Sequence, residues 1–179
     1  MSNSSSQKIT AACPLPRVGI SACLLGHQVR YDGKVKHYAQ IDKLRTEMAF
    51  IAVCPEMATG LGMPRPAIQL VDDRAKPRAV EVLDAGIDVS AALRDTARQW
   101  LTAHPDLHGY ITRSRSPSCG YQSTPIYSSA GEQQALGDGL FIEVLRQLRP
   151  QLAIIDELAL QDKALRHIFL KRLNEACNE

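Results

Sequence analysis

One sequence feature constrains the fold of this chain more than any other. It consists of three short segments that favour β-strands, each followed by a cysteine. The segments are apolar on both faces, which is typical of strands in a parallel sheet that is covered on both sides. Strands are therefore predicted over residues 17–22, 50–54 and 109–112. In open α/β sheets, ligands bind beyond the carboxyl ends of the strands. Because Cys23, Cys54 and Cys119 stand near these ends, we expect three thiols from distant parts of the chain to converge on one point.

Helical patterns separate the predicted strands. Apolar residues at helical spacings, together with capping residues, predict helices over residues 39–49, 90–103, 140–148 and 163–176. Ser90 and Asp162 are the expected N-caps of the second and the last of these helices. Further strands are predicted over residues 79–83, at a sheet edge, and 152–155, whereas glycines and prolines make residues 55–66 too broken for regular structure. Strands that alternate with helices predict an α/β fold with a mainly parallel, Rossmann-like sheet flanked by helices.

The length of 179 residues suggests one domain with a core of its own. Residues 1–16 begin with a polar, serine-rich stretch, so we expect a disordered tail there and one domain over residues 17–179. The tail lacks the apolar core of a signal peptide, and no stretch has the length and apolar character of a membrane span. A net charge of +2, not gathered into runs, argues against non-specific binding to nucleic acid.

The five cysteines are odd in number and widely spaced, which argues against the disulfide framework of a small secreted domain. We therefore expect a cytoplasmic protein whose thiols stay reduced. For Cys13, in the tail, and Cys177, near the chain end, the ordinary role of cysteine as a small apolar residue is sufficient. The three cysteines at the strand ends need a different explanation, because they share one setting.

Zinc and phosphatase chemistry are both poor explanations of these three cysteines. Zinc fingers and ribbons use closely paired cysteines, which this chain lacks, and a structural zinc would need a fourth ligand such as His27 or His37. A phosphatase-type nucleophile would need an arginine six residues beyond the cysteine, and none of the three has one. Three thiolates suit a 4Fe-4S cluster better, since they would leave one iron with an open position for a ligand or substrate.

Five short motifs make the sequence similar to a known family. In chain order they are SACLLG at 21–26, VRYDG at 29–33, CPE at 54–56, PRP at 64–66 and SPSCG at 116–120. Together they resemble the thiouracil desulfidase family over about residues 17–170. Residues 138–141 and 166–169 look more like the branch that is associated with 4-thiouracil derivatives and tRNA 4-thiouridine. After the PRP motif many members place an acidic residue, whereas this chain has Gln69 in a neutral stretch.

The resemblance implies a cofactor and a reaction. Members bind a 4Fe-4S cluster through three cysteines, which match Cys23, Cys54 and Cys119 here. The fourth iron would act as a Lewis acid on a thiocarbonyl sulfur while water attacks the ring carbon, without net redox change. Glu56, two residues beyond a ligand, is then the expected general base or proton shuttle. Ser116 is expected to orient the water or the ring.

Several loop residues are candidates for binding the substrate. They are Arg30, Tyr31, Asp32, Arg113 and Ser118. Arginine suits bidentate contacts with phosphate or a uracil ring. Ser118 is also the alternative to Ser116 for orienting the water or the ring. Structural roles stay open for four of the site residues: Glu56 as a helix cap after a proline, the two serines as turn residues, and Asp32 in an Asx-turn before a glycine.

The function predicted from these features is non-redox desulfuration of a thiolated uracil base, nucleoside or nucleotide, with release of hydrogen sulfide. A small substrate is favoured over tRNA, because the chain has no basic stripe. A tRNA 4-thiouridine desulfidase is the first alternative. A non-catalytic zinc or iron–sulfur sensor that uses the same thiols is the second.

Overall fold

In the computed structural model of this chain, residues 15–72 and 76–178 are described. The predicted tail over residues 1–16 therefore lies outside the described residues except at its end, and so does Cys13. None of the helices in the described part has the combination of length and apolar character that a membrane crossing needs.

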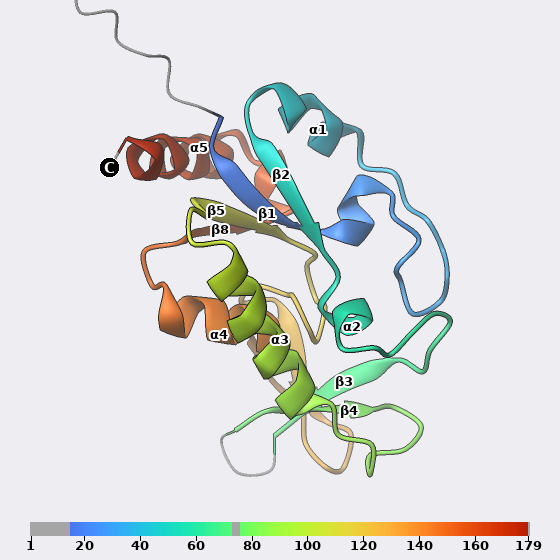
Figure 1. Cartoon of the computed structure of the whole chain (residues 1–179). Helices are drawn as coiled ribbons and strands as arrows, with labels where there is room; N and C mark the ends of the chain where they lie inside the picture. The colour runs from blue at the N-terminus through green and yellow to red at the C-terminus, as the bar shows by residue number, and fades with distance from the viewer. Residues whose placement is uncertain (1–14, 73–75, 179) are drawn as a thin grey trace, which may run out of the picture.

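A four-stranded parallel sheet, sheet A, forms the centre of the molecule (Figure 1). Its strands are β1 (Arg17–Ser21), β2 (Ala49–Val53), β5 (Gly109–Thr112) and β8 (Ala153–Asp156). They lie in the order β2-β1-β5-β8, so the chain first moves to one side of β1 and then returns to its other side. The predicted α/β fold with a mainly parallel sheet is confirmed. The reversal of strand order beside β1 is the point at which such sheets usually bind ligands.

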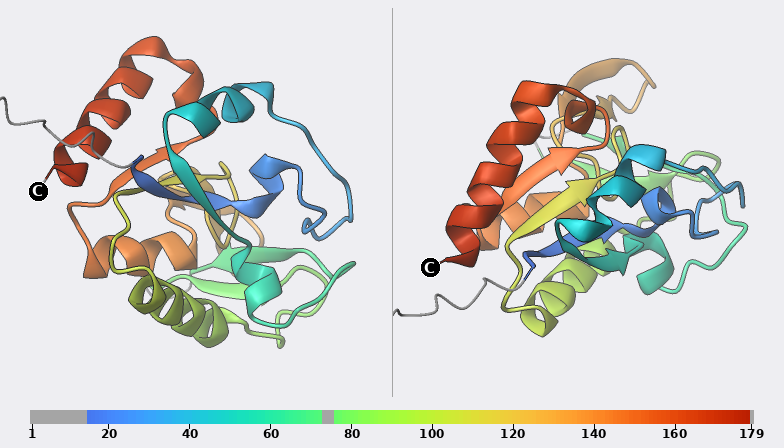
Figure 2. Two further views of the ribbon diagram at one scale, coloured as in Figure 1. Left: turned by 45° about the horizontal axis from the view of Figure 1, so that its top comes forward. Right: turned by 90° about the horizontal axis from the view of Figure 1, so that it is seen from above.

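Helices cover both faces of sheet A. The α-helices are α1 (Ala39–Asp42), α2 (Pro55–Ala58), α3 (Ser90–Ala103), α4 (Leu140–Leu148) and α5 (Lys163–Cys177). Short 3-10 helices are η1 (Ala22–Leu25), η2 (Lys43–Thr46) and η3 (Ala159–Gln161). Figure 2 shows α5 along one face of the sheet and α3 with α4 on the opposite face. On the α5 face, Ile20 and Ile111 pack with Phe169, whereas Tyr110 points to the other face and packs with Phe141.

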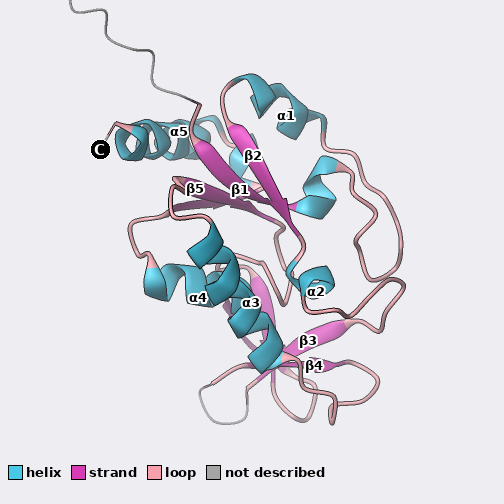
Figure 3. Ribbon diagram, in the orientation of Figure 1, coloured by secondary structure: helices cyan, strands magenta, loops and turns pink. Residues whose placement is uncertain are grey.

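A second four-stranded sheet, sheet B, lies beyond α3 and α4 (Figure 3). Its strands are β3 (Ile68–Val71), β4 (Arg78–Glu81), β6 (Thr124–Tyr127) and β7 (Gln133–Gly137). They lie in the order β4-β3-β6-β7, with β3 and β6 parallel and the two outer pairs antiparallel. Leu70 of β3 packs against Leu93 and Leu140, at the amino-terminal ends of α3 and α4. Of these four strands, only β4 was predicted from the sequence.

The helix bounds follow the sequence prediction closely in places and depart from it in others. Helices α3 and α4 cover the predicted residues, and Asp162 caps α5 by accepting hydrogen bonds from the Ala164 and Leu165 amides. The predicted N-cap role of Ser90 is wrong. Its hydroxyl accepts a hydrogen bond from the Ala79 amide of β4 at 2.8 Å, so it links α3 to sheet B instead.

Two other segments differ from the prediction. The helix expected over residues 39–49 consists of one turn of α1 and the 3-10 turn η2, and β2 already begins at Ala49. The segment 55–66, expected to be irregular, begins with the single-turn helix α2. Pro55 occupies its first position, where a missing amide hydrogen costs the helix nothing. Cys54 is therefore the N-cap residue of a helix, directly after a strand.

Candidate functional site

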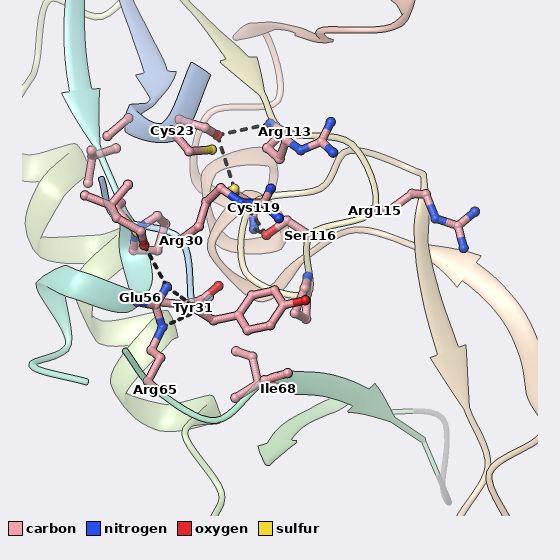
Figure 4. Close-up of a pocket in the computed structure, with 18 of the residues that line it drawn as sticks. Cys23, Arg30, Tyr31, Glu56, Arg65, Ile68, Arg113, Arg115, Ser116 and Cys119 are labelled. Carbon is pink, nitrogen blue, oxygen red and sulfur yellow. Dashed lines mark hydrogen bonds and ion pairs between the residues drawn. The ribbon is translucent and has the colours of Figure 1, made fainter. Parts of the chain in front are cut away.

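A pocket of about 390 Å³ opens at the carboxyl ends of β1, β2 and β5 (Figure 4). Cys23 reaches it from η1, Cys54 from the start of α2, and Cys119 from the loop after β5. The structure thus brings the three predicted cysteines to one place, although long stretches of chain separate them. The pocket lies beside β1, where the strand order of sheet A reverses.

The three thiols share a desolvated environment and act on one another. The pKa of Cys23 is raised to about 12, mainly by burial and then by the charges of Cys119 and Cys54, while Arg113 and Arg30 act in the opposite direction. Burial likewise raises the pKa of Cys54, although the Met57 amide of α2 partly offsets this. These mutual effects agree with the place of all three thiols on the wall of one pocket.

Cys119 is the most buried of the three thiols, at 6% exposure. Burial raises its pKa to about 11, against hydrogen bonds with Ser116 and Ser21 that lower it. The Ser21 hydroxyl, from the last residue of β1, donates to the Cys119 sulfur at 3.1 Å. Ser116 Oγ lies 3.3 Å from the same sulfur and accepts hydrogen bonds from the Cys119 and Ser118 amides at 3.2 and 3.3 Å. The sulfur is thus held by hydroxyls from two sides.

Glu56 lines the pocket and is fixed by two neighbours. Its Oε2 atom accepts from Arg65 Nη2 at 2.7 Å and Nε at 2.8 Å, and its Oε1 atom accepts from Ser118 Oγ at 2.7 Å. Arg65 also donates to the Gly62 and Val29 carbonyl oxygens at 2.9 and 3.0 Å. The side chain of Arg65 is only 4% exposed and that of Glu56 13%, so the pair is nearly dry.

Two of the predicted substrate-binding residues lie outside the pocket lining. Ser118 is fully buried and donates to Glu56. Asp32 accepts from Arg30 at 3.0 Å and from the Lys34 amide at 3.1 Å, which forms the Asx-turn that the sequence left open. Arg30 itself lines the pocket.

Tyr31 and Arg113, also predicted to bind substrate, do line the pocket. Tyr31 is 45% exposed, and Figure 4 shows it among the residues that line the pocket. The Arg113 guanidinium forms an ion pair with the buried Glu157, and its amide donates to Ser21 Oγ at 3.1 Å. Neither His27 nor His37, the suggested fourth zinc ligands, belongs to the lining. His37 contacts Asp42 at 2.7 Å instead.

The donor atoms bear on which metal group fits here. Over residues 15–72 and 76–178, no three His, Cys, Asp or Glu side chains surround one point closely enough to hold a single metal ion. A cluster of several irons is wider than an ion, so its ligands stand farther apart, and thiolates are the ligands that such clusters use. Three free thiols on the wall of one pocket therefore fit an iron–sulfur cluster better than a lone zinc ion.

Three residues of this site were not singled out from the sequence. Arg65 belongs to the quoted PRP motif, but nothing in the pattern shows that it pairs with Glu56. Ser21 closes a strand that reads as a core element, and its contact with Cys119 bridges distant segments. Glu157 follows β8 and gave no local signal of the ion pair that it forms.

Comparison with known proteins agrees with this geometry. The profile of the 2-thiouracil desulfurase family matches residues 18–157. The uncharacterized protein YbbK of Bacillus subtilis strain 168 is 28% identical over 135 residues, which cover 72% of this chain and 88% of that protein. The solved structure of the 4Fe-4S-dependent thiouracil desulfidase TudS has a TM-score of 0.66 and 31% identity, covering 86% of this chain and 98% of that chain. The resemblance predicted from the five motifs is confirmed, and the chain belongs to the 2-thiouracil desulfurase family.

Proposed function

We propose that this protein replaces the sulfur of a thiolated uracil base, nucleoside or nucleotide by oxygen and releases hydrogen sulfide. The observation that carries the proposal is the convergence of Cys23, Cys54 and Cys119 in one pocket together with Glu56 and Ser116. The reaction balances without an oxidant: water adds to the ring carbon, the carbon–sulfur bond breaks, and the sulfur leaves with the two hydrogens of water as H₂S. The family match and the solved TudS structure support this chemistry.

Three cysteines would hold a 4Fe-4S cluster in the pocket. When bound, such a cluster supplies one iron without a protein ligand, a Lewis acid suited to a thiocarbonyl sulfur. The free thiols and the absence of a disulfide among Cys23, Cys54 and Cys119 fit a reducing cytoplasm, where such clusters are assembled.

Glu56 is the proposed general base that takes a proton from the attacking water. Arg65 and Ser118 each donate to one of its oxygens, so the carboxylate is held in place while lone pairs remain free for the water. On this basis Ser118, which the sequence suggested as a substrate contact, acts by orienting Glu56.

Ser116 is the proposed partner of the water or the ring. Its hydroxyl lines the pocket and contacts the Cys119 sulfur at 3.3 Å, so it stands beside the metal-binding wall. As the acceptor of two amide hydrogens, its oxygen directs its own hydrogen elsewhere. It can therefore donate either to the Cys119 sulfur or to an oxygen or ring nitrogen in the pocket.

The pocket favours a small substrate. Its volume of about 390 Å³ lies at the lower end of the range for small-molecule sites and suits a pyrimidine with at most a sugar phosphate. Arg30 and Arg113 line it and would meet the polar edge of the ring or a phosphate, with Tyr31 also in the lining. The resemblance of the carboxyl half to the 4-thiouracil branch makes 4-thio substrates the first to test.

The decisive experiment measures sulfide release by anaerobically reconstituted protein. The panel contains 2-thiouracil, 4-thiouracil, 4-thiouridine, its 5′-monophosphate and thiolated tRNA. We expect turnover of a small 4-thio compound, and tRNA turnover that fails or is slower. Protein that contains iron and inorganic sulfide but releases no sulfide from any of the five would refute the proposal. Tight tRNA binding that weakens steeply with added salt would favour the tRNA reaction instead.

The role of Glu56 has its own test. Glu56→Gln should keep the iron content and lose about 10²–10⁴-fold in kcat, the usual contribution of a positioned acid–base group. Glu143→Gln is the matched control, because Glu143 pairs with Arg94 in a partly buried site away from the pocket. Normal turnover by Glu56→Gln would place the base elsewhere.

A further inference from the structure

Glu157 is a completely buried carboxylate that none of the proposed steps uses. It directly follows β8, and its amide donates to the Thr112 carbonyl oxygen at 3.1 Å, which extends the pairing of β8 with β5. Its Oε2 atom accepts from the Ser114 amide at 2.6 Å and its Oε1 atom from the Ser114 hydroxyl at 2.8 Å. Arg113 completes the set with an ion pair to Oε1. A buried charge is stable only when it is paired and hydrogen-bonded, and these donors meet that need.

All donors to this carboxylate come from two adjacent residues at the end of β5. Because one buried carboxylate holds both residues, it fixes the point at which β5 passes into the loop that carries Ser116. The next residue, Arg115, has a left-handed backbone at φ 61°, a conformation that residues other than glycine rarely adopt because it is strained. Its amide is held by Ser123 Oγ at 3.0 Å. The loop keeps this conformation because the contacts on both sides of Arg115 impose it.

The contacts of Glu157 with Arg113 and Ser114, called the anchor below, also determine the positions of two pocket groups, Ser116 and Arg113. Ser116 follows the left-handed residue, and its hydroxyl reaches the Cys119 sulfur and two amides of the ligand loop. Arg113 is turned toward Glu157 on one side while its amide binds Ser21, whose hydroxyl also contacts Cys119. Moving the anchor would therefore move Ser116 and Arg113 relative to the same sulfur.

We propose that Glu157 is a positioning residue: it holds Arg113 and Ser114 so that Ser116 stands at the Cys119 wall of the pocket in the geometry that the reaction needs. The effect on turnover rests on the proposed function, whereas the holding of the loop over residues 113–120 does not. Two separate measurements test these two parts.

The first readout is hydrogen exchange of the cluster-free protein, followed by mass spectrometry. Glu157→Gln keeps the size of the side chain but removes its charge, so the ion pair with Arg113 is lost. Its NH₂ group must also face a hydrogen-bond donor of Ser114 or Arg113. We expect at least tenfold faster exchange in peptides over residues 113–120 and unchanged exchange in α4. Asp156→Asn is the matched control, since Asp156 lies one residue earlier and caps η3 through the Leu158 and Ala159 amides. Unchanged exchange over residues 113–120 in Glu157→Gln would overturn the inference.

The second readout is kinetic coupling in the reconstituted enzyme. Loss of groups that orient metal-site residues typically costs about 10–100-fold in activity, and we expect a fall of that size in kcat for Glu157→Gln with the parent iron content. If Glu157 acts through Ser116, the double variant Glu157→Gln/Ser116→Ala should be hardly slower than Ser116→Ala alone. Losses that multiply, or a kcat of Glu157→Gln within twofold of the parent, would refute the coupling.

The outcomes are separable from those of the proposed function. A wild-type protein that releases no sulfide refutes the proposed reaction, while the exchange experiment still decides whether Glu157 holds the loop. If Glu157→Gln does not fold, Ser114→Ala replaces it, because that variant removes one donor and leaves the ion pair intact. Faster exchange over residues 113–120 and a lower kcat in Ser114→Ala support the inference, and parent values of both contradict it.

Discussion

Replacing Arg65 by leucine is a sharp test of how the pocket is built. Arg65 and Glu56 are nearly dry and their charged atoms lie 2.7 Å apart. At an effective dielectric constant of about 20, charges at that distance attract by roughly 6 kcal/mol, and desolvation offsets part of it. Removal of one partner of a buried pair typically costs about 3–5 kcal/mol, because the other charge stays buried without a partner. We therefore expect R65L to lower the free energy of unfolding by about 3–5 kcal/mol.

Urea unfolding of the cluster-free protein under reducing conditions measures this quantity, with an unchanged m-value as the sign that both states are comparable. Arg98→Leu is the matched control. Arg98 pairs with Asp95 on the exposed side of α3, and the loss of such a surface pair should cost at most about 1 kcal/mol. The double variant E56Q/R65L should be more stable than R65L by about 1–3 kcal/mol, since it no longer buries an unpaired carboxylate. An R65L protein within 1 kcal/mol of the parent, or no recovery in the double variant, would refute the reasoning.

Three further predictions concern the thiols, the ligand loop and acid stability. Replacement of any one pocket cysteine by alanine should abolish the brown chromophore and iron binding on reconstitution, whereas Cys177→Ala should leave both intact. Gly139→Ala would place a Cβ atom 2.5 Å from the Ser118 carbonyl carbon and 2.7 Å from the Cys119 amide, so the ligand backbone must shift; we expect about 1–3 kcal/mol lower stability and less bound iron. Although burial opposes it, hydrogen bonds from Ser90 hold the pKa of Asp88 below its usual value. This stabilisation is complete above the unfolded pKa of about 3.9 and is lost as the pH falls through the lower, folded value. In acid unfolding curves, the advantage over Asp88→Asn should therefore shrink as the pH falls below about 3.9 and vanish once it is below the folded pKa.

Sheet A and the helices α3, α4 and α5 were predictable because their signals are local. Buried parallel strands are continuous apolar runs, and α3, α4 and α5 carry apolar stripes and, in α5, the Asp162 cap. The strands of sheet B have weaker signals. Strand β7 is exposed along nearly its whole length, so no apolar alternation marks it. Strand β6 contains Pro125, which argues against a strand when the sequence is read alone.

In the candidate site, too, features with a local sequence signal were predictable and features without one were not. The position of a cysteine beyond a strand end is a local property, so three strand ends were enough to predict convergence. The partners of the charged residues are not local: Arg65 meets Glu56 across a broken segment, and Arg113 meets Glu157 across 44 positions of the chain. Charge pairing of this kind depends on which side chains the fold places together in a dry environment. The charged residues can be found in the sequence, but their ion-pair partners cannot.

The two buried ion pairs of the pocket are arranged in opposite senses. In one, the arginine is the more buried partner, with 4% of the Arg65 side chain exposed against 13% for Glu56. In the other, the carboxylate is fully buried and 27% of the Arg113 side chain is exposed. The pocket therefore has an anion, Glu56, beside Cys54 and a cation, Arg113, after the end of β5. Each is held by a buried residue of opposite charge. A hydrolytic desulfuration needs both, because a proton must leave the water on one side while negative charge moves onto the departing sulfur on the other.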